Sequence, residues 1–308
     1  MFRTGFVGNL PDSVKEILLL HPAFDVTGCY FPEIADHHKK HKTTHNIPEF
    51  ALKTLFEIND VLIFQKADLY TLEIISEALK LSMHIMIIDI CDMPSWAIAE
   101  LIKLQEEAQT VVRTKQIARY NPALQACNPL ITHPLLIELK LLIPGTIDGT
   151  EKDTVTRTLL KMLDALLFIC PGKIRKIHSV RHPVSISSTC FINARIEFDN
   201  GSVANLLSSG VTDQESFTID IYQKNKLFKI DMVSYKLLSF KRSEENNKIN
   251  STKLDYDDPG NKTFYNELES FFQAILNNST SARELYKTFQ LLELSRKITQ
   301  KSGFSELV

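Results

Sequence analysis

Four of the nine histidines of this chain lie within nine residues, where their spacing could bind a metal ion. They occur in the run DHHKKH, which begins at Asp36, and at His45. In a helix, His37, His41 and His45 would recur on one face, a spacing that lets two or three imidazoles chelate a divalent cation. The lysines among them repel a cation. We therefore favour an exposed polar helix that binds metal only adventitiously and predict no metal cofactor; a physiological metal site is the alternative.

The composition restricts the ligands that the chain can bind. Only 10 of its 308 residues are glycine, whereas an average glycine content of about 7% would give roughly 21. The chain therefore has few glycines from which a glycine-rich nucleotide-binding loop could be formed. The net charge of -2 and the pI near 6.5 argue against nucleic acid as a partner, because its binding needs a basic face. The five scattered cysteines predict buried thiols and neither a disulfide framework nor a zinc site.

The chain reads as a soluble protein of about two domains. Hydrophobic residues make up 44% and charged residues 23% of the sequence. No apolar run approaches the roughly 20 residues of a membrane span, and the beginning MFRTGFVGNL lacks the apolar core of a signal peptide. We therefore predict a cytoplasmic protein that does not contact a membrane.

The first 120 residues alternate between short apolar runs and amphipathic segments, which predicts alternating strands and helices. The predicted strands are Thr4 to Val7, Phe24 to Tyr30, Asp60 to Phe64 and His84 to Ile88. The predicted helices are Ser13 to Leu20, capped by Asp12 or Ser13, Leu69 to Leu81, and Ser95 to Ala108, capped by Ser95. Two strands, DVLIF and HIMII, are apolar on both faces, which is typical of a parallel sheet covered on both sides. Residues 1–120 should therefore form a doubly wound, Rossmann-like α/β domain.

After Asn121-Pro122 the pattern changes to helices that flank a block of longer strands. The predicted helices are Asp153 to Ile169, Tyr265 to Leu276 and Ala282 to Ser302. The predicted strands are Lys173 to Ser179, Thr189 to Phe198, Val203 to Ser209, Phe217 to Gln223, Lys226 to Met232 and Lys236 to Phe240. Turn signals at Asp199-Asn200-Gly201 and Lys224-Asn225 join successive strands.

Residues 121–308 should therefore form an α+β domain with an open, mostly antiparallel sheet that helices cover on one face. The C-terminal helices could also pack back on the first domain. The other face of the sheet carries alternating apolar residues and needs a partner, which a second subunit would supply. The polar segment from Ser243 to Gly260 is predicted to be a solvated surface loop.

Several segments, taken in order, resemble the glucose-fructose oxidoreductase and inositol dehydrogenase (Gfo/Idh/MocA) family over almost the whole length. The segments are TGFVGNL, HPAFDVTGCYFP, DVLIF, SEALKLSMHIMIID, the tetrapeptide Arg119-Tyr120-Asn121-Pro122, FDNGSVANLLSS and the C-terminal helices. The resemblance implies an NAD(P)-binding domain, a sheet domain, hydride transfer at a sugar-like or cyclic polyol carbinol, and assembly of subunits through the open sheets. It also implies that Arg119 and Asn121 belong to the cofactor site.

The positions that would bind a dinucleotide depart from the family pattern. The glycine-rich run Gly-x-Gly-x-x-Gly aligns with Gly8, Asn9, Leu10, Pro11, Asp12 and Ser13, so only its first glycine remains. We expect Leu10 to stand where the pyrophosphate would approach, and Asp12 to repel it at the helix N-terminus. The acid that should bind the ribose aligns with Phe31, and Glu33 is an alternative two residues further on. Thr71 stands where many members have a histidine.

The catalytic positions differ as well. The lysine of the family's Glu-Lys-Pro run aligns with Asp89, within Ile88-Asp89-Ile90. The alignment of Asp164 with an acidic residue of the family places Arg157 and Lys161 at the positions of its Asp/His pair, where the histidine acts as a general base. Lys161 could act as a base if burial and the nearby Arg157 lowered its pKa; the alternative is a solvated or anion-binding helix face.

Two functions follow from these substitutions. The first is a Gfo/Idh/MocA-like protein without NAD(P) chemistry, which has a binding or assembly role as a homo-oligomer or as the partner of an active paralogue. The second is an active, divergent NAD(P)-dependent oxidoreductase whose contacts have moved. We favour the first, because a misalignment would have to recur independently at every position to explain so many changes.

Overall fold

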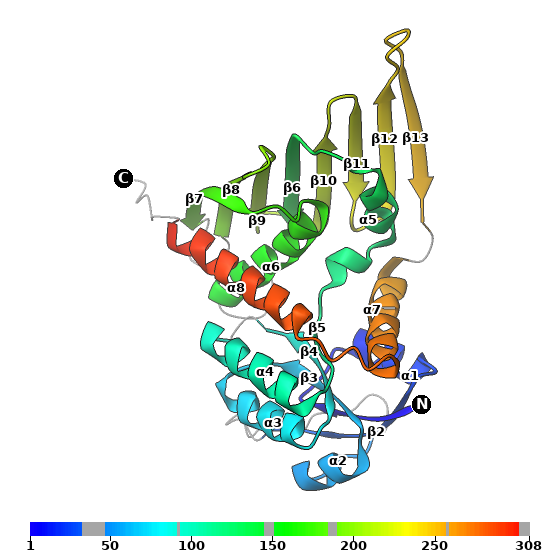
Figure 1. The fold of residues 1–308 in the computed structure, drawn as a ribbon, viewed down its shortest axis with the longest axis vertical. Helices are drawn as coiled ribbons and strands as arrows, with labels where there is room; N and C mark the ends of the chain where they lie inside the picture. Colours follow the sequence, from blue (N-terminus) through cyan, green and yellow to red (C-terminus); the bar gives the residue numbers. More distant parts are fainter. Residues whose placement is uncertain (33–46, 91–92, 145–150, 184–189, 257–258, 302–308) are drawn as a thin grey trace. The chain divides into compact units, whose positions relative to one another are not determined.

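The computed structural model describes residues 1–32, 47–90, 93–144, 151–183, 190–256 and 259–301 (Figure 1). The histidine cluster and Glu33 lie outside these residues. The chain divides into two compact units, each built from two segments. The first contains Met1–Lys115 and Phe264–Gln290, and the second contains Gln116–Thr263 and Leu291–Val308. Residues 264–290 thus belong to the first unit although they follow the second unit's sheet in the sequence.

The first unit contains a five-stranded sheet in the order β2-β1-β3-β4-β5, in which all neighbouring strands are parallel. Its strands are β1 (Phe2–Val7), β2 (Phe24–Tyr30), β3 (Val61–Lys66), β4 (His84–Asp89) and β5 (Val112–Thr114). Its helices are α1 (Asp12–Leu20), α2 (Leu52–Ile58), α3 (Leu69–Lys80), α4 (Ser95–Ala108) and most of α7 (Pro259–Leu276). The predicted doubly wound α/β arrangement is confirmed.

Helix α7 explains why the first unit needs residues from the far end of the chain. Its side chains Phe264, Leu268 and Phe271 share one hydrophobic core with α1 and with Phe6 and Ile63 of the sheet. Strand β3 is fully buried from residue 61 to residue 64, so both of its faces must be covered. Helices α1 and α7 provide that cover on one face.

The cap residues of two helices differ from the prediction. Helix α1 begins at Asp12 with Pro11 at the N-cap, and α4 begins at Ser95 with Pro94 at the N-cap; neither cap residue makes a side-chain hydrogen bond. The predictions that Asp12 or Ser13 caps the first helix and that Ser95 caps the later one are therefore wrong. Proline has a fixed φ of about −65°, which suits the extended residue that precedes each of these helices, Pro11 with φ of −55° and Pro94 with φ of −72°.

The second unit contains an eight-stranded sheet in the order β13-β12-β11-β10-β6-β9-β8-β7. Only β6 and β9 are parallel, and the other neighbours are antiparallel. The strands are β6 (Leu136–Leu142), β7 (Ile174–Pro183), β8 (Cys190–Phe198), β9 (Val203–Ser209), β10 (Ser216–Tyr222), β11 (Lys226–Asp231), β12 (Lys236–Arg242) and β13 (Ile249–Asp255). The predicted open, mostly antiparallel sheet is confirmed.

Helices cover one face of this sheet, as expected. They are η1 (Ile117–Tyr120), α5 (Pro122–Cys127), η2 (Asn128–Leu130), α6 (Glu151–Ile169) and the second half of α8 (Arg283–Lys301). Buried residues of α6 and α8, among them Leu163, Leu166 and Ile298, pack with Ile219 and Phe217 of the sheet in one hydrophobic core. The second unit therefore has a core of its own.

The segment from Ser243 to Gly260 is not a loop throughout, so that prediction is wrong in part. Residues Ile249–Asp255 form the edge strand β13, which pairs with all of β12 although every one of its side chains is exposed. Hairpin pairing satisfies its backbone groups without a hydrophobic face. Its polar sequence therefore carried no strand signal.

None of the helices within the described ranges is long and apolar enough to cross a membrane.

Candidate functional site: the nucleotide loop and helix α6

Gly8 follows β1 and begins the loop that aligns with a dinucleotide-binding loop. Its φ of +90° lies in the left-handed region that favours glycine, and its amide donates to the Tyr30 carbonyl at 2.9 Å. A Cβ at this position would lie 2.7 Å from Oε1 of Gln65. The first glycine therefore allows a tight turn, but a side chain of this protein occupies the space beside it.

Gln65 also occupies a backbone donor of the loop. Its Oε1 accepts a hydrogen bond of 2.8 Å from the amide of Asn9. The neighbouring strands explain the contact, because β1 and β3 pair in parallel with Val7 opposite Phe64, which brings the residues that follow them together. In a dinucleotide-binding loop such amides point at phosphate oxygens; here the amide of Asn9 has an internal acceptor.

Lys15 brings a buried positive charge to the same loop. Its side chain is 4% exposed, and its Nζ donates to Oδ1 of Asn9 at 3.1 Å and to Oδ1 of Asp12 at 3.2 Å. The carboxylate of Asp12 thus supplies, from within the chain, the kind of oxygen anion that a bound phosphate would offer. Sequence reasoning missed both Lys15 and Gln65; the i, i+3 spacing of Asp12 and Lys15 in a helix was the available signal.

Leu10 lies differently from the expectation. Its side chain is 1% exposed and packs in the core of the first unit with Val14 and Phe6, so it does not project into the path of a phosphate. It anchors the loop to the core instead. Pro11, which follows it, has no amide hydrogen to offer a ligand, and Asp12 places a negative charge in the first turn of α1.

The other positions implied by the resemblance lie at the ends of β2, β3 and β4. Phe31 is half-buried and packs against the core of the first unit, and Asp89 is the last residue of β4. Thr71 forms a capping box with Asp68 at the start of α3. Burial acts to raise the pKa of Asp68, but hydrogen bonds from Lys66 and Thr71 outweigh it and hold that pKa below its usual value.

Helix α6 carries the proposed catalytic pair of the second unit. Arg157 is exposed. Lys161 is 40% exposed in its side chain, forms an ion pair with Glu215, and places Nζ 5.7 Å from the centroid of the Phe217 ring. Lys161 is thus half of an ion pair and not the isolated, desolvated amine that a general base of this kind would be.

Arg119 and Asp164 form a largely buried ion pair that joins η1 to α6. Their side chains are 16% and 4% exposed. Nε of Arg119 donates to Oδ1 of Asp164 at 3.1 Å, and Nη2 of Arg119 contacts the same oxygen. A guanidinium that is this well buried against a carboxylate holds the entry to the second unit onto its core helix.

Asn121 is the N-cap of α5. Its Oδ1 accepts from the amides of Ala123 and Leu124, and its Nδ2 donates to the Met232 carbonyl at 3.0 Å. The residue is 3% exposed. Asn121 therefore joins a helix start to the loop after β11, and its side-chain oxygen and nitrogen both have partners within the second unit.

The described parts of the chain hold no clustered set of metal ligands, and burial affects the thiols of Cys29 and Cys127. No group of three or more histidine, cysteine or acidic side chains is arranged there to bind a metal, and the histidine cluster lies outside those parts. Burial raises the pKa of Cys29 to about 11 and that of Cys127 to about 12. These thiols stay protonated at neutral pH and are not nucleophiles.

A five-stranded parallel unit together with a large, mostly antiparallel open sheet defines the fold of this chain, and the same fold is found in solved dehydrogenase structures of the Gfo/Idh/MocA type. No family profile and no curated protein sequence matches the chain. Solved structures do match it over nearly its whole length. The resemblance inferred from the sequence is thereby confirmed for the fold, and the site residues that it implied stay predictions.

Three structures illustrate the likeness. UDP-N-acetylglucosamine 3-dehydrogenase GnnA from Acidithiobacillus ferrooxidans is 16% identical, with a TM-score of 0.78 over 98% of this chain and 97% of that one. A dehydrogenase from Chromobacterium violaceum is 13% identical, with a TM-score of 0.80 over 97% and 94%. A variant of KijD10, a 3-ketoreductase from Actinomadura kijaniata crystallised with NADP, is 15% identical, with a TM-score of 0.75 over 98% of each chain.

Proposed function

We propose that this chain is an oxidoreductase-fold protein that no longer binds NAD(P) and acts in binding or assembly. The observation that carries the proposal is the internal occupation of the nucleotide loop. Gln65 takes the amide of Asn9, and Lys15 is paired with Asn9 and Asp12. A dinucleotide would have to displace these contacts and approach the carboxylate of Asp12. The residues present therefore do not fit NAD(P), and we assign no hydride-transfer step to them. We place the protein in the cytoplasm, as the sequence analysis predicts.

The first test is a titration of the purified protein with NADH and with NADPH, followed by cofactor fluorescence. We expect no saturable binding up to about 1 mM of either cofactor. A dissociation constant tighter than about 100 μM, or roughly -5.5 kcal/mol, requires an intact pocket. That result would overturn the proposal. It would favour the second function considered above, an active, divergent oxidoreductase that acts on a sugar-like or cyclic polyol substrate.

A double variant tests whether Gln65 and Asp12 are what prevents cofactor binding. Gln65→Ala/Asp12→Asn frees the Asn9 amide and removes the negative charge from the first turn of α1. We expect it to bind NADH or NADPH more tightly than the unmodified protein does, whereas Gln125→Ala, at an exposed glutamine of α5, should change nothing. If the paired variant gains no affinity, the loop is closed by something other than these two side chains.

We also propose that the uncovered sheet face binds a second copy of the chain. Pairing registers align one apolar row across five neighbouring strands of that face: Val203, Leu136, Tyr222, Leu227 and Phe240. All five side chains are only half-buried within the single chain. They alternate with residues that face the helices, such as Ile137 and Phe228, which are fully buried. An apolar row of this extent favours a partner that also presents an apolar sheet face.

Sedimentation velocity tests this assembly. We expect a dimer for the unmodified protein and a monomer for Leu227→Glu/Phe240→Glu, because two carboxylates would be buried without partners. The control Leu20→Glu makes the same change at a leucine of the first unit that is 81% exposed and should remain dimeric. A monomeric unmodified protein would contradict self-association, and an active paralogue would then be the partner to seek.

A further inference from the structure

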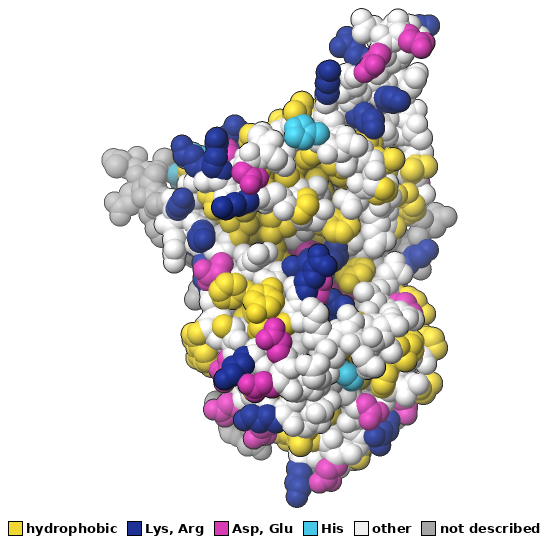
Figure 2. Space-filling view, viewed as in Figure 1, with side chains coloured by type: hydrophobic (Ala, Val, Ile, Leu, Met, Phe, Trp, Pro, Cys, Tyr) yellow, Lys and Arg dark blue, Asp and Glu magenta, His cyan; other side chains and the backbone are white. Residues whose placement is uncertain are grey.

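Strand β7 is a long edge strand with an unusual charge. It spans ten residues at one end of the eight-stranded sheet. With Lys173 before it, its basic residues are Lys173, Arg175, Lys176, Arg181, His178 and His182. It has no acidic residue, although the whole chain has a net charge of -2. Figure 2 shows Lys and Arg side chains gathered over β7 and β8 at this edge of the sheet.

The neighbouring strand β8 and the turn after it carry few acidic residues. On β8 and in the turn after it, the acidic residues are Glu197 and Asp199, and Arg195 adds a further cation. Glu197 is already engaged: its carboxylate lies 3.0 Å from Arg175 and 3.7 Å from Arg195. The hydrogen bond from Arg175 holds the pKa of Glu197 below its usual value. Within β7, β8 and the turn after β8, basic residues therefore outnumber acidic ones.

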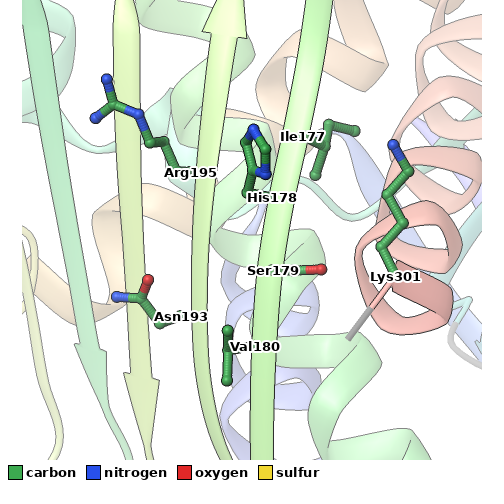
Figure 3. Close-up of a pocket in the computed structure, with 7 residues that line it drawn as sticks. All are labelled: Ile177, His178, Ser179, Val180, Asn193, Arg195 and Lys301. Carbon is green, nitrogen blue, oxygen red and sulfur yellow. The ribbon is translucent and has the colours of Figure 1, made fainter. Parts of the chain in front are cut away.

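A hollow of about 400 Å³ lies along this edge, lined by seven residues (Figure 3). Ile177 and Ser179 point toward the helix that carries Lys301, and Oγ of Ser179 donates to the Ile298 carbonyl at 2.7 Å. His178 and Val180 project from the other side of the strand, beside Asn193 and Arg195 of β8. Side chains from both faces of β7 thus line the hollow.

Strand β7 is paired along one of its two edges. Among the described residues, β8 is the only strand that pairs with it, and after a register shift between Ile174 and Lys176 the pairing runs regularly to Pro183. In an antiparallel pair alternate backbone groups face away from the partner. Such a row of outward N–H and C=O groups is a template for an added strand; the irregularity before Lys176 and the proline at residue 183 limit it here to residues 176–182. Nδ1 of His182, beside Phe191, is buried and has no hydrogen-bond partner among the described atoms.

The basic residues of β7 determine which kind of strand can pair with it. A second β7 would place Lys and Arg against Lys and Arg, and like charges on adjacent strands are destabilising, whereas opposite charges are stabilising. The basic residues thus prevent self-pairing at this edge and favour an acidic strand. A nucleic acid would use the charge but not the backbone groups.

We propose that β7 binds an extended acidic peptide segment of a partner protein, which adds to the sheet as a ninth, antiparallel or parallel strand. Its backbone pairs with the free edge of β7. Its carboxylates lie against Lys176 and Arg195 on the face of β7 that points away from the helices, and its alternate apolar side chains lie on the opposite face, beside Ile177 and the stem of Lys301. This surface lies in the second unit and is independent of the nucleotide loop.

The test uses the whole protein and a fluorescein-labelled peptide of ten residues that alternates glutamate and valine. We expect saturable binding by fluorescence anisotropy that weakens at least about tenfold in Lys176→Glu/Lys301→Glu and on raising the salt to about 0.3 M. The control Lys53→Glu/Lys80→Glu reverses the charge of two exposed lysines of the first unit. Lys80 lies in the last turn of α3, as Lys301 lies in the last turn of α8. This control should bind the peptide as the unmodified protein does.

Backbone pairing separates a bound strand from a general polyanion surface. We expect the peptide to slow hydrogen exchange of the β7 amides, and the same peptide with proline at alternate valines to lose both the binding and the protection, because proline cannot donate. Equal binding of the proline peptide or of a thymidine oligonucleotide, or equal binding by the Lys176→Glu/Lys301→Glu variant, would overturn the proposal. So would a failure of the unmodified protein to bind the acidic peptide.

Discussion

Asp164→Ala should lower the free energy of unfolding by about 3–5 kcal/mol, because it leaves the guanidinium of Arg119 buried without its carboxylate. Chemical denaturation followed by circular dichroism measures the change. The exposed pair Lys103 and Glu107, with side chains 77% and 61% exposed, provides the comparison, and Glu107→Ala should cost at most about 1 kcal/mol.

A double variant distinguishes a stabilising role from a site of chemistry. Replacing both partners, as Arg119→Met/Asp164→Leu, removes both charges and should recover most of the lost stability, because an apolar pair of similar volume can replace a buried ion pair. If Asp164→Ala costs less than about 1 kcal/mol, the pair does not hold η1 to α6, and Arg119 would be available for the ligand role that the resemblance implies.

Asn121→Ala should destabilise the protein by about 2–4 kcal/mol. The loss combines a helix N-cap, worth about 0.5–2 kcal/mol, with an unpaired buried carbonyl at Met232, worth about 1–3 kcal/mol. The same denaturation experiment measures it. Asn277→Ala, at an exposed asparagine after α7, should change stability by less than about 0.5 kcal/mol.

A second substitution, Asn121→Asp, distinguishes a role of Asn121 in the fold from a role in cofactor binding. Asn121→Asp keeps an acceptor for the amides of Ala123 and Leu124 but loses the donor to Met232, so we expect a stability between those of the unmodified protein and Asn121→Ala. A cofactor role would appear instead as unchanged stability together with altered NADH binding. That outcome would contradict the assignment of Asn121 to the fold.

Much of the secondary structure was predictable because its signals are local. Strand β3 is apolar at consecutive positions since both of its faces are buried, and the turn at Asn200-Gly201 uses a glycine with φ of +85°. Strands β9 and β10 alternate buried and half-buried residues, as a one-sided sheet requires.

Other elements lacked such a signal or needed the fold to interpret it. Strand β13 has no buried side chain, so only its pairing with β12 makes it a strand. Strand β6 alternates apolar and charged residues, but its insertion between β10 and β9 joins segments distant in sequence. Helix α7 is amphipathic in sequence, yet nothing local assigns its apolar face to the core of the first unit.

The candidate site shows the same division. The sequence by itself predicted that a single glycine of the nucleotide run remains and that charge and residue type differ from the family pattern at the catalytic positions, because these predictions need only the aligned residues. Only the tertiary structure decided what occupies the loop instead. The contact of Gln65 with Asn9 spans 56 residues and exists because parallel β1 and β3 are neighbours in register. The ion pair between Arg119 and Asp164 likewise depends on the packing of η1 against α6, which no local sequence pattern predicts.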